Sequence, residues 1–275
     1  MTEVGITERG DAALDDSWVP WVYEKNLPAI LITKNAPLLE QSHPDIFSKN
    51  VIIHATCTGL GETIFESNVH SSNIFAWLRE LPKEYLSKIV LRVDPICIPL
   101  LAYDKDIAVP KETTIKTENK DHTYIPSRLY MSLLQLYFDI AVELGLRVRI
   151  SFMDLYGHVL ARFLDKPDLY NFLKDSYKGD LHYPLEDRLE FLNLIKTDFP
   201  SITFEVCGEP GIPCTGCVSV KDLKILNVYN PDEVIPFGEQ RPACCCLATK
   251  KELLNNKHPC GHNCIYCYWK KVEEK

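Results

Sequence analysis

Three cysteines, Cys260, Cys264 and Cys267, stand in the spacing C-x₃-C-x₂-C. Three thiolates this close in sequence can hold one [4Fe–4S] cluster, and because the cluster has four irons, one iron then has no protein ligand. The same thiolates could instead bind zinc together with His258 or His262, since zinc accepts three cysteines and a histidine. The spacing therefore predicts a metal centre and leaves its metal open between these two.

The open iron of such a cluster can chelate the amino and carboxylate groups of S-adenosylmethionine (SAM). It can then pass one electron to the sulfonium, which breaks a C–S bond and releases a carbon radical. The segment resembles the cluster motif of the radical SAM superfamily, and Tyr266, directly before the third cysteine, fits the aromatic position of that motif. The resemblance implies a [4Fe–4S] cluster on the three cysteines, with Tyr266 near the adenine of SAM.

A longer resemblance is carried by several segments outside this motif. They are Phe204–Glu209, Gly216–Cys217, Gln240–Cys246 and Pro259–Tyr268, with weaker echoes at Thr58–Gly59, Glu66–Asn68 and Leu91–Ile96. Over about residues 28–269 the chain resembles a family of uncharacterised bacterial proteins with a C-terminal cluster motif of the radical SAM type, distantly similar to spore photoproduct lyase. The chain departs from that family at Leu31–Pro37, where the relatives have Ser, Arg, Thr and Asp, so its substrate can differ.

Most of the other cysteines fall into a second group. Nine of the eleven cysteines lie between Cys207 and Cys267. Those that match family cysteines are Cys207, Cys217, Cys244 and Cys246. Four thiolates from separate loops would make a closed second site for zinc or an auxiliary iron–sulfur cluster. The alternative is a set of separately buried, reduced thiols. Cys214 and Cys245 are extra to the family match, and their use is unknown.

Gly208 and Glu209 resemble the end of the Gly-Gly-Glu-Pro motif of the radical SAM superfamily, whose groups bind the amino group of SAM. A carboxylate after a strand end can pair with an ammonium by a charge-assisted hydrogen bond. Here the motif precedes the cluster loop, whereas in the superfamily it follows it.

The first hypothesis for function is a radical SAM enzyme that acts on a small molecule and takes electrons from a flavodoxin or ferredoxin. Cys245–Leu247 resembles part of a motif in an offshoot of the family that acts in arsinothricin biosynthesis. That resemblance implies transfer of the 3-amino-3-carboxypropyl group of SAM to a thiophilic acceptor such as trivalent arsenic. Two further hypotheses are repair of DNA lesions and a non-catalytic zinc-binding module.

The composition narrows the partners. The net charge of −8 argues against nucleic acid, because proteins that bind it usually carry a basic surface. The polar, acidic N-terminal residues and the lack of an apolar run of about 18 residues predict a cytoplasmic protein with no membrane partner. In that reducing compartment, clustered cysteines are expected to be metal ligands or redox groups rather than structural disulfides.

Strand-like and helix-like segments alternate along the chain. Continuous apolar runs predict strands at 30–33, 51–56, 89–94, 146–152 and 202–206. Helical spacing predicts helices at 73–81, 127–144, 168–177 and 185–199. We therefore expect an α/β fold, a complete or partial (β/α) barrel followed by a Cys-rich C-terminal segment that binds the cluster.

This pattern divides the chain into three regions. They are an N-terminal extension (1–27), the barrel-like core (28–206) and the Cys-rich C-terminal segment (207–275), which packs on the same domain. Residues 105–127 are expected to form a solvated excursion or lid. Cys97 is expected to be core.

The βα loops of a barrel carry its site, which selects polar residues at strand ends. These are His54, Cys57, Thr58, Gly59, Arg92, Asp94, Ser151, Asp154 and Glu205–Glu209.

Overall fold

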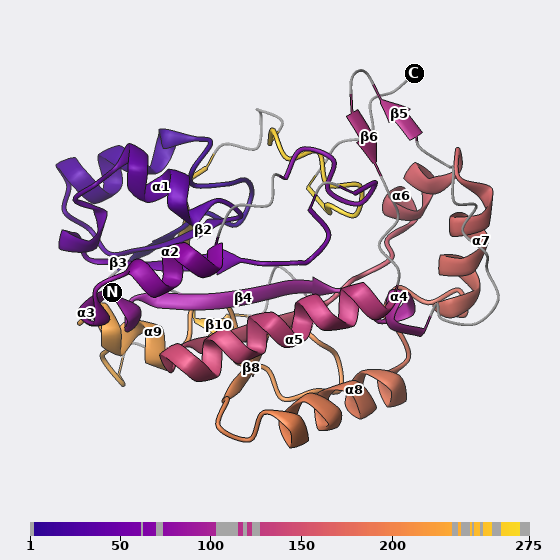
Figure 1. The fold of residues 1–275 in the computed structure, drawn as a ribbon. Coiled ribbons are helices and arrows are strands. Elements are labelled where there is room, and N and C mark those ends of the chain that lie inside the picture. The colour runs from indigo at the N-terminus through magenta and orange to yellow at the C-terminus, as the bar shows by residue number, and fades with distance from the viewer. Residues whose placement is uncertain are drawn as a thin grey trace.

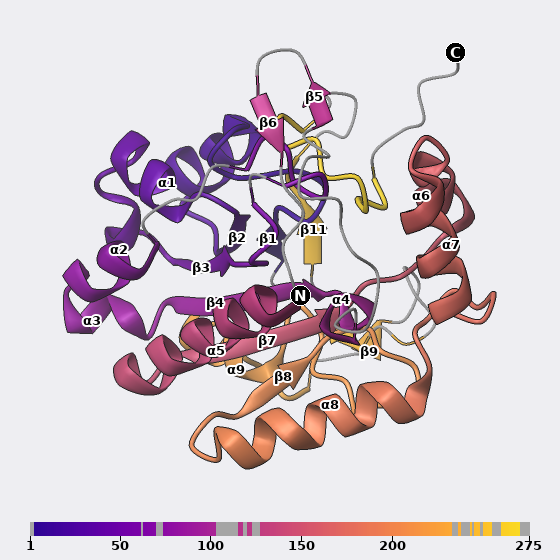
Figure 2. The same ribbon diagram turned by 45° about the vertical axis from the view of Figure 1, so that its right-hand side comes forward.

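The central feature is a parallel sheet of seven strands that curls into a half-barrel (Figures 1 and 2). The computed structural model describes residues 3–61, 63–69, 74–102, 115–117, 120–122, 127–232, 236–237, 243, 245–247, 250–254 and 260–269. The strand order is β11-β1-β2-β3-β4-β7-β8. The strands are β1 (Val4–Ile6), β2 (Ala29–Thr33), β3 (Val51–Thr56), β4 (Ile89–Ile96), β7 (Arg147–Phe152), β8 (Phe204–Val206) and β11 (Lys250–Glu252). An α/β architecture is therefore confirmed.

Five of these strands, β2, β3, β4, β7 and β8, fall where continuous apolar runs predict them. The other two come from segments that were not expected in the sheet. Strand β1 pairs with β2 through Gly5 and Ala29, and β11 pairs with β1 through Lys250 and Val4. The two ends of the chain therefore meet in the sheet, which brings the Cys-rich segment beside β1.

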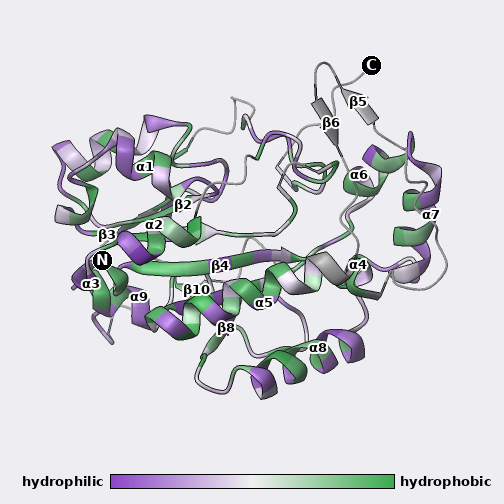
Figure 3. Ribbon diagram, viewed as in Figure 1, coloured by the Kyte–Doolittle hydropathy of each residue, from purple (hydrophilic) through white to green (hydrophobic). Residues whose placement is uncertain are grey.

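Helices cover the outer face of the sheet. They are α1 (Ala36–Ser42), α2 (Ile74–Glu80), α3 (Lys83–Leu86), α4 (Ile98–Ala102), α5 (Ser127–Leu144), α6 (Gly157–Leu160), α7 (Pro167–Ser176) and α8 (Leu185–Asp198). The four expected helices correspond to α2, α5, α7 and α8. Figure 3 shows that α5 and α8 mix hydrophilic and hydrophobic residues, whereas β4 is mostly hydrophobic. In α8, Phe191, Leu192 and Ile195 are buried at helical spacing, so this helix presents one apolar stripe to the sheet.

Side chains alternate between two hydrophobic cores along each strand. Leu31, Ile53 and Leu91 belong to the outer core under the helices. Their neighbours Ile30, Ile52 and Val90 belong to the inner core. Leu223 of the short helix α9 (Val220–Ile225) and Leu226, directly after that helix, pack in the same core. Because strand side chains alternate with period two, the register carries the same alternation across the sheet. The C-terminal segment thus fills the concave side of the half-barrel.

A buried ionic network anchors that segment to the sheet. Arg149 of β7 donates to Glu205 of β8 at 2.5 Å and to Asp222 of α9 at 3.0 Å. It also donates to the carbonyl oxygen of Cys217 at 2.9 Å, and Arg147 donates to Asp222 at 2.8 Å. Buried charges persist only when they are paired and hydrogen-bonded. These pairs therefore fix the loop that carries Cys217 against the strands.

Two small antiparallel pairs lie outside the main sheet. Strands β9 (Pro236–Phe237) and β10 (Cys246–Leu247) form one, and β5 (Ile115–Thr117) and β6 (Lys120–His122) form the other. The expected lid at 105–127 lies largely outside the described residues, which include only β5, β6 and the first residue of α5 there. Among the described helices, we find none with the length and apolar character required to cross a membrane.

Candidate metal centres

The cluster loop, residues 260–269, packs against the loop that follows β3. Cys264 forms an antiparallel β-bridge with Glu66, and Ile265 N donates to Phe65 O at 2.9 Å. Asn68 N donates to His262 O at 3.3 Å. The cluster loop is therefore held at the carboxyl ends of the sheet strands, the end that carries the site in parallel α/β folds (Figure 2).

The three thiols of the motif lie close enough in this loop for their charges to act on one another. Cys264 is buried, Cys267 is half-buried and Cys260 is exposed. Burial raises the pKa of Cys264 to about 12 and that of Cys260 to about 11, and the neighbouring charge of Cys267 adds to both shifts. A bound metal relieves the repulsion between neighbouring thiolates, because each thiol exchanges its proton for a bond to the metal. The donor set fits a cluster held by three thiolates.

Tyr266 is half-buried and belongs to a polar triad beside the thiols. Lys34 Nζ donates to Glu66 Oε1 at 2.6 Å and to the Tyr266 hydroxyl oxygen at 3.0 Å, and that hydroxyl donates to the Glu66 carboxylate. Thr58 Oγ1 donates to the other carboxylate oxygen at 2.7 Å. Burial alone lowers the pKa of Lys34, but the charges of Glu66 and Cys264 raise it above its ordinary value. A fixed positive charge therefore lies beside the motif.

Asp11 and His262 tie the cluster loop to the loop after β1. His262 Nε2 lies 2.6 Å from Asp11 Oδ2. Asp11 also accepts from Thr33 Oγ1 and from Lys34 N, each at 2.6 Å. Burial by itself would raise the pKa of Asp11, but these hydrogen bonds hold that pKa below its ordinary value. Within the described part of the chain the buried Nδ1 of His262 has no hydrogen-bond partner. His258, the other candidate zinc ligand, lies outside the described residues.

The far side of the cluster loop is held by the segment after β7. Arg162 donates from one guanidinium nitrogen to Ile265 O at 2.9 Å and to Cys267 O at 2.7 Å. His158 Nε2 lies 3.1 Å from Tyr268 O, and Tyr156 packs against the Tyr268 ring. Contacts on both sides thus fix the backbone that carries the third cysteine.

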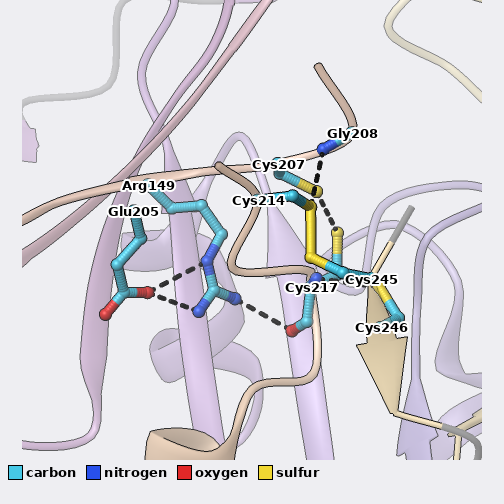
Figure 4. Close-up of a disulfide and its surroundings, with 8 residues drawn as sticks. All are labelled: Arg149, Glu205, Cys207, Gly208, Cys214, Cys217, Cys245 and Cys246. Atoms are coloured by element: carbon cyan, nitrogen blue, oxygen red, sulfur yellow. Dashed lines mark hydrogen bonds and ion pairs between the residues drawn. A yellow bond between two sulfur atoms is a disulfide. The ribbon is translucent and has the colours of Figure 1, made fainter. Parts of the chain in front are cut away.

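A second group of thiols gathers on the inner face of the sheet (Figure 4). The Sγ atoms of Cys207 and Cys217 lie 3.1 Å apart, and Cys217 N donates to Cys246 Sγ at 2.9 Å. The contact with Cys217, together with burial, raises the pKa of Cys207 well above its ordinary value. Three of the four expected ligands therefore converge, whereas Cys244 lies outside the described residues.

Cys214 and Cys245, the two cysteines left without a role, form a disulfide. It corrects, for this pair, the expectation that clustered cysteines are not joined as disulfides. Cys214 Sγ also accepts from Gly208 N at 3.4 Å. Since Cys245 precedes Cys246 and Cys214 lies three residues before Cys217, the bond staples the loops that carry the second thiol group (Figure 4).

Glu209 is engaged within the protein, away from the cluster loop. Its Oε1 accepts from Phe152 N and its Oε2 from Arg188 of α8, both at 2.7 Å. Burial raises its pKa to about 7. Neither partner belongs to the cluster loop. These hydrogen bonds hold Glu209 to β7 and α8, and Gly208 N donates to Cys214 Sγ.

The remaining strand-end residues divide into two sets. Thr58, bonded to Glu66, lies with the triad, and Arg92 forms an ion pair with Asp94, which also accepts from Ser151. The others have structural contacts. His54 and Glu205 contact Arg149, and Asp154 contacts His182. Gly59 takes a positive φ, and Cys57 is buried in the outer core. Cys97, which was expected to be core, is buried there as well.

Sequence reasoning missed Asp11 and Lys34 beside the cluster loop, and also Glu8, whose carboxylate lies within 4.8 Å of the thiols of Cys217 and Cys246. Glu8 and Asp11 precede the first expected strand, and Lys34 lies within the stretch that departs from the family pattern. Each follows a sheet strand directly or within a few residues. Recognising β1 as a strand would have drawn attention to the loop after it.

Comparison with known families gives one finding. A family model described as "Domain of unknown function (DUF1848)" matches residues 24–269. Among curated proteins no match was found.

Proposed function

The chain belongs to the DUF1848 family, and we propose that it is a radical SAM enzyme whose [4Fe–4S] cluster is held by Cys260, Cys264 and Cys267. The observation that carries the proposal is the cluster loop itself: three thiols whose charges act on one another, at the carboxyl ends of parallel strands, with the mostly buried cation of Lys34 close to them. Three thiolates and no fourth thiol in the loop match a cluster with one open iron.

When bound, such a cluster supplies one electron for reductive cleavage of SAM, by default to a 5′-deoxyadenosyl radical that abstracts hydrogen from a substrate. The residues around the loop have the tasks of binding and orientation. Lys34 offsets part of the negative charge of the thiolates, and Glu66 holds Lys34 and Tyr266 in place. Asp11 and Arg162 fix the loop from opposite sides.

The polar residues beside the triad are the candidates for contact with a small-molecule substrate. Arg92 and Asp94 of β4 and Ser151, near the carboxyl end of β7, form one hydrogen-bonded group. The charge of Asp94 acts on both Lys34 and Tyr266. An electron donor of the flavodoxin or ferredoxin type completes the proposed system.

Anaerobic reconstitution with iron and sulfide tests the cofactor. We expect about four irons and four sulfides per cluster and broad absorption near ~400 nm. Replacing Cys260, Cys264 and Cys267 together by alanine should abolish both. Cys57→Ala, which removes a buried thiol of the outer core, is the matched control and should retain them. A wild-type chain that holds zinc alone and gains no such absorption would overturn the proposal.

A further inference from the structure

A carboxylate joins the second thiol group. One oxygen of Glu8, Cys217 Sγ and Cys246 Sγ all lie within 4.8 Å of one another. The three residues come from separate parts of the chain: the loop after β1, the loop before α9, and β10. Cys207, which follows β8, lies with its Sγ 3.1 Å from that of Cys217. Three potential metal ligands thus meet at the inner face of the half-barrel, and the thiol of Cys207 lies against one of them, Cys217.

The surroundings of this group compensate negative charge. Lys250 Nζ lies 2.9 Å from Glu8 Oε2. Arg92 is close enough to Glu8, Cys207 and Cys217 for their charges to act on it. Thiolates and a carboxylate gathered in a buried place repel one another unless cations are near. Two fixed cations reduce that repulsion in part, and a divalent ion would remove most of the rest.

We propose that Glu8, Cys207, Cys217 and Cys246 form a zinc site, with Glu8 as the oxygen ligand. Zinc takes four ligands in structural sites and accepts both cysteine sulfur and glutamate oxygen. When zinc binds, each of the three thiols loses its proton to solvent and forms a bond to the ion. No electron is transferred. The ion joins β1, the end of β8 and β10, so its role is to close the inner face of the sheet.

This site is independent of the proposed cluster, since the two share no residue. The Cys214–Cys245 disulfide flanks it and limits the movement of the ligand-bearing loops (Figure 4). Glu252 provides a matched control for Glu8. It is a neighbouring carboxylate that accepts from Glu8 N at 3.0 Å and from Leu254 N at 3.0 Å, and it is not part of the ligand group.

The test is a titration of the metal-free, full-length chain with Co²⁺, followed by displacement with Zn²⁺. Thiolate-to-cobalt charge-transfer bands report binding. The same titration is run in the Cys264→Ser chain, so that cobalt in the cluster loop is recognised. We expect Glu8→Gln to weaken binding by roughly tenfold or more, because even residues outside the ligand shell change metal affinity by that factor. Glu252→Gln should retain the wild-type affinity.

Glu8→Asp, which keeps the carboxylate, should bind more tightly than Glu8→Gln, and circular dichroism checks that each variant is folded. Equal affinity in Glu8→Gln and wild type would contradict the proposal. So would charge-transfer bands that survive Cys217→Ser and vanish in Cys264→Ser, because the metal would then lie in the cluster loop. Failure to assemble an iron–sulfur cluster leaves this result unaffected.

Discussion

Lys34 and Glu66 together connect the cluster loop to the ends of two strands. Its ammonium is buried and contacts both Glu66 and Tyr266, and Glu66 in turn contacts Thr58. Glu66 forms the bridge to Cys264 through its backbone. One carboxylate therefore connects the loop after β3, the end of β2 and the cluster loop.

Replacing Glu66 by glutamine should destabilise the protein by about 3 kcal/mol or more, because it leaves the buried Lys34 charge without a counter-charge. The double variant Lys34→Met and Glu66→Gln should lose clearly less than the sum of the two single variants. Tyr266→Phe, which removes one hydroxyl, should cost about 1 kcal/mol. Chemical denaturation measures all four chains. Additive losses in the double variant would show that the pair is not coupled.

Glu209 gives a prediction about pH. Its pKa of about 7 lies above the ordinary value of 4.5, so the folded state keeps a proton that the unfolded state has lost. The free energy of unfolding should therefore fall as pH rises from about 4.5 to 7, by about 3 kcal/mol, and be constant above. Glu209→Gln keeps an acceptor for Phe152 N and should flatten this slope. A slope that is the same in both chains would contradict the prediction.

At the scale of the elements, the loop before α9 is shaped by a glycine at its closest approach to β10. Gly216 has φ +75°, and a Cβ there would lie 2.8 Å from the backbone nitrogen of Cys246. Gly145, at the end of α5, has φ +65° with open space around it. Both positions have a left-handed backbone, which a residue with a side chain rarely adopts, but only at Gly216 would a side chain also meet the backbone of β10.

Gly145→Ala should therefore cost about 1–2 kcal/mol from the left-handed conformation alone. Gly216→Ala should cost more, and it should also weaken metal binding at the second thiol group, because it separates Cys217 from Cys246. Thermal unfolding and the Co²⁺ titration measure the two effects. Equal losses of stability with unchanged cobalt binding would show that the loop and β10 are not in close contact.

The ionic network of the inner face is also a property of the elements it joins. Arg149→Met should cost about 3 kcal/mol, since it removes one of two buried cations and leaves Glu205 and Asp222 to share Arg147. Arg79→Met removes an exposed ion pair with Glu143 and should cost less than about 1 kcal/mol. Urea denaturation compares the two. Losses of similar size would contradict the anchoring role given to Arg149.

The strands show what sequence can and cannot predict here. Strands β3 and β4 are long, apolar and buried on both faces, so their pattern is visible in the sequence alone. Strand β11 is a three-residue edge strand of Lys250, Lys251 and Glu252, and such a charged strand depends on pairing with β1 rather than on its own pattern. Segments with long-range pairing and weak local signals were therefore missed.

At the scale of the whole molecule, the sheet brings together residues far apart in the chain. The cysteine spacing of the cluster loop was visible in the sequence, because its ligands are local. Its supporting residues Asp11, Lys34 and Glu66 come from three other loops, and only the fold shows that they meet. Glu8 joined the second thiol group for the same reason.

The half-barrel also shows how the two candidate metal centres are connected. Residues 8–11 connect them: Glu8 belongs to the second thiol group and Asp11 holds His262 of the cluster loop. Arg92 and Asp94 lie on β4, and their charges act on the second thiol group and on the triad, respectively. The carboxyl ends of the strands are thus the candidate functional face of this fold.

The most direct test of the radical SAM assignment is anaerobic incubation of the reconstituted protein with a strong reductant and SAM, followed by identification of the products. We expect 5′-deoxyadenosine, formed by wild type and by the Cys57→Ala control and not by Cys264→Ala. Methylthioadenosine would instead indicate transfer of the carboxypropyl group. If SAM stays intact in a wild-type chain with a fully assembled and reduced cluster, the assignment is contradicted.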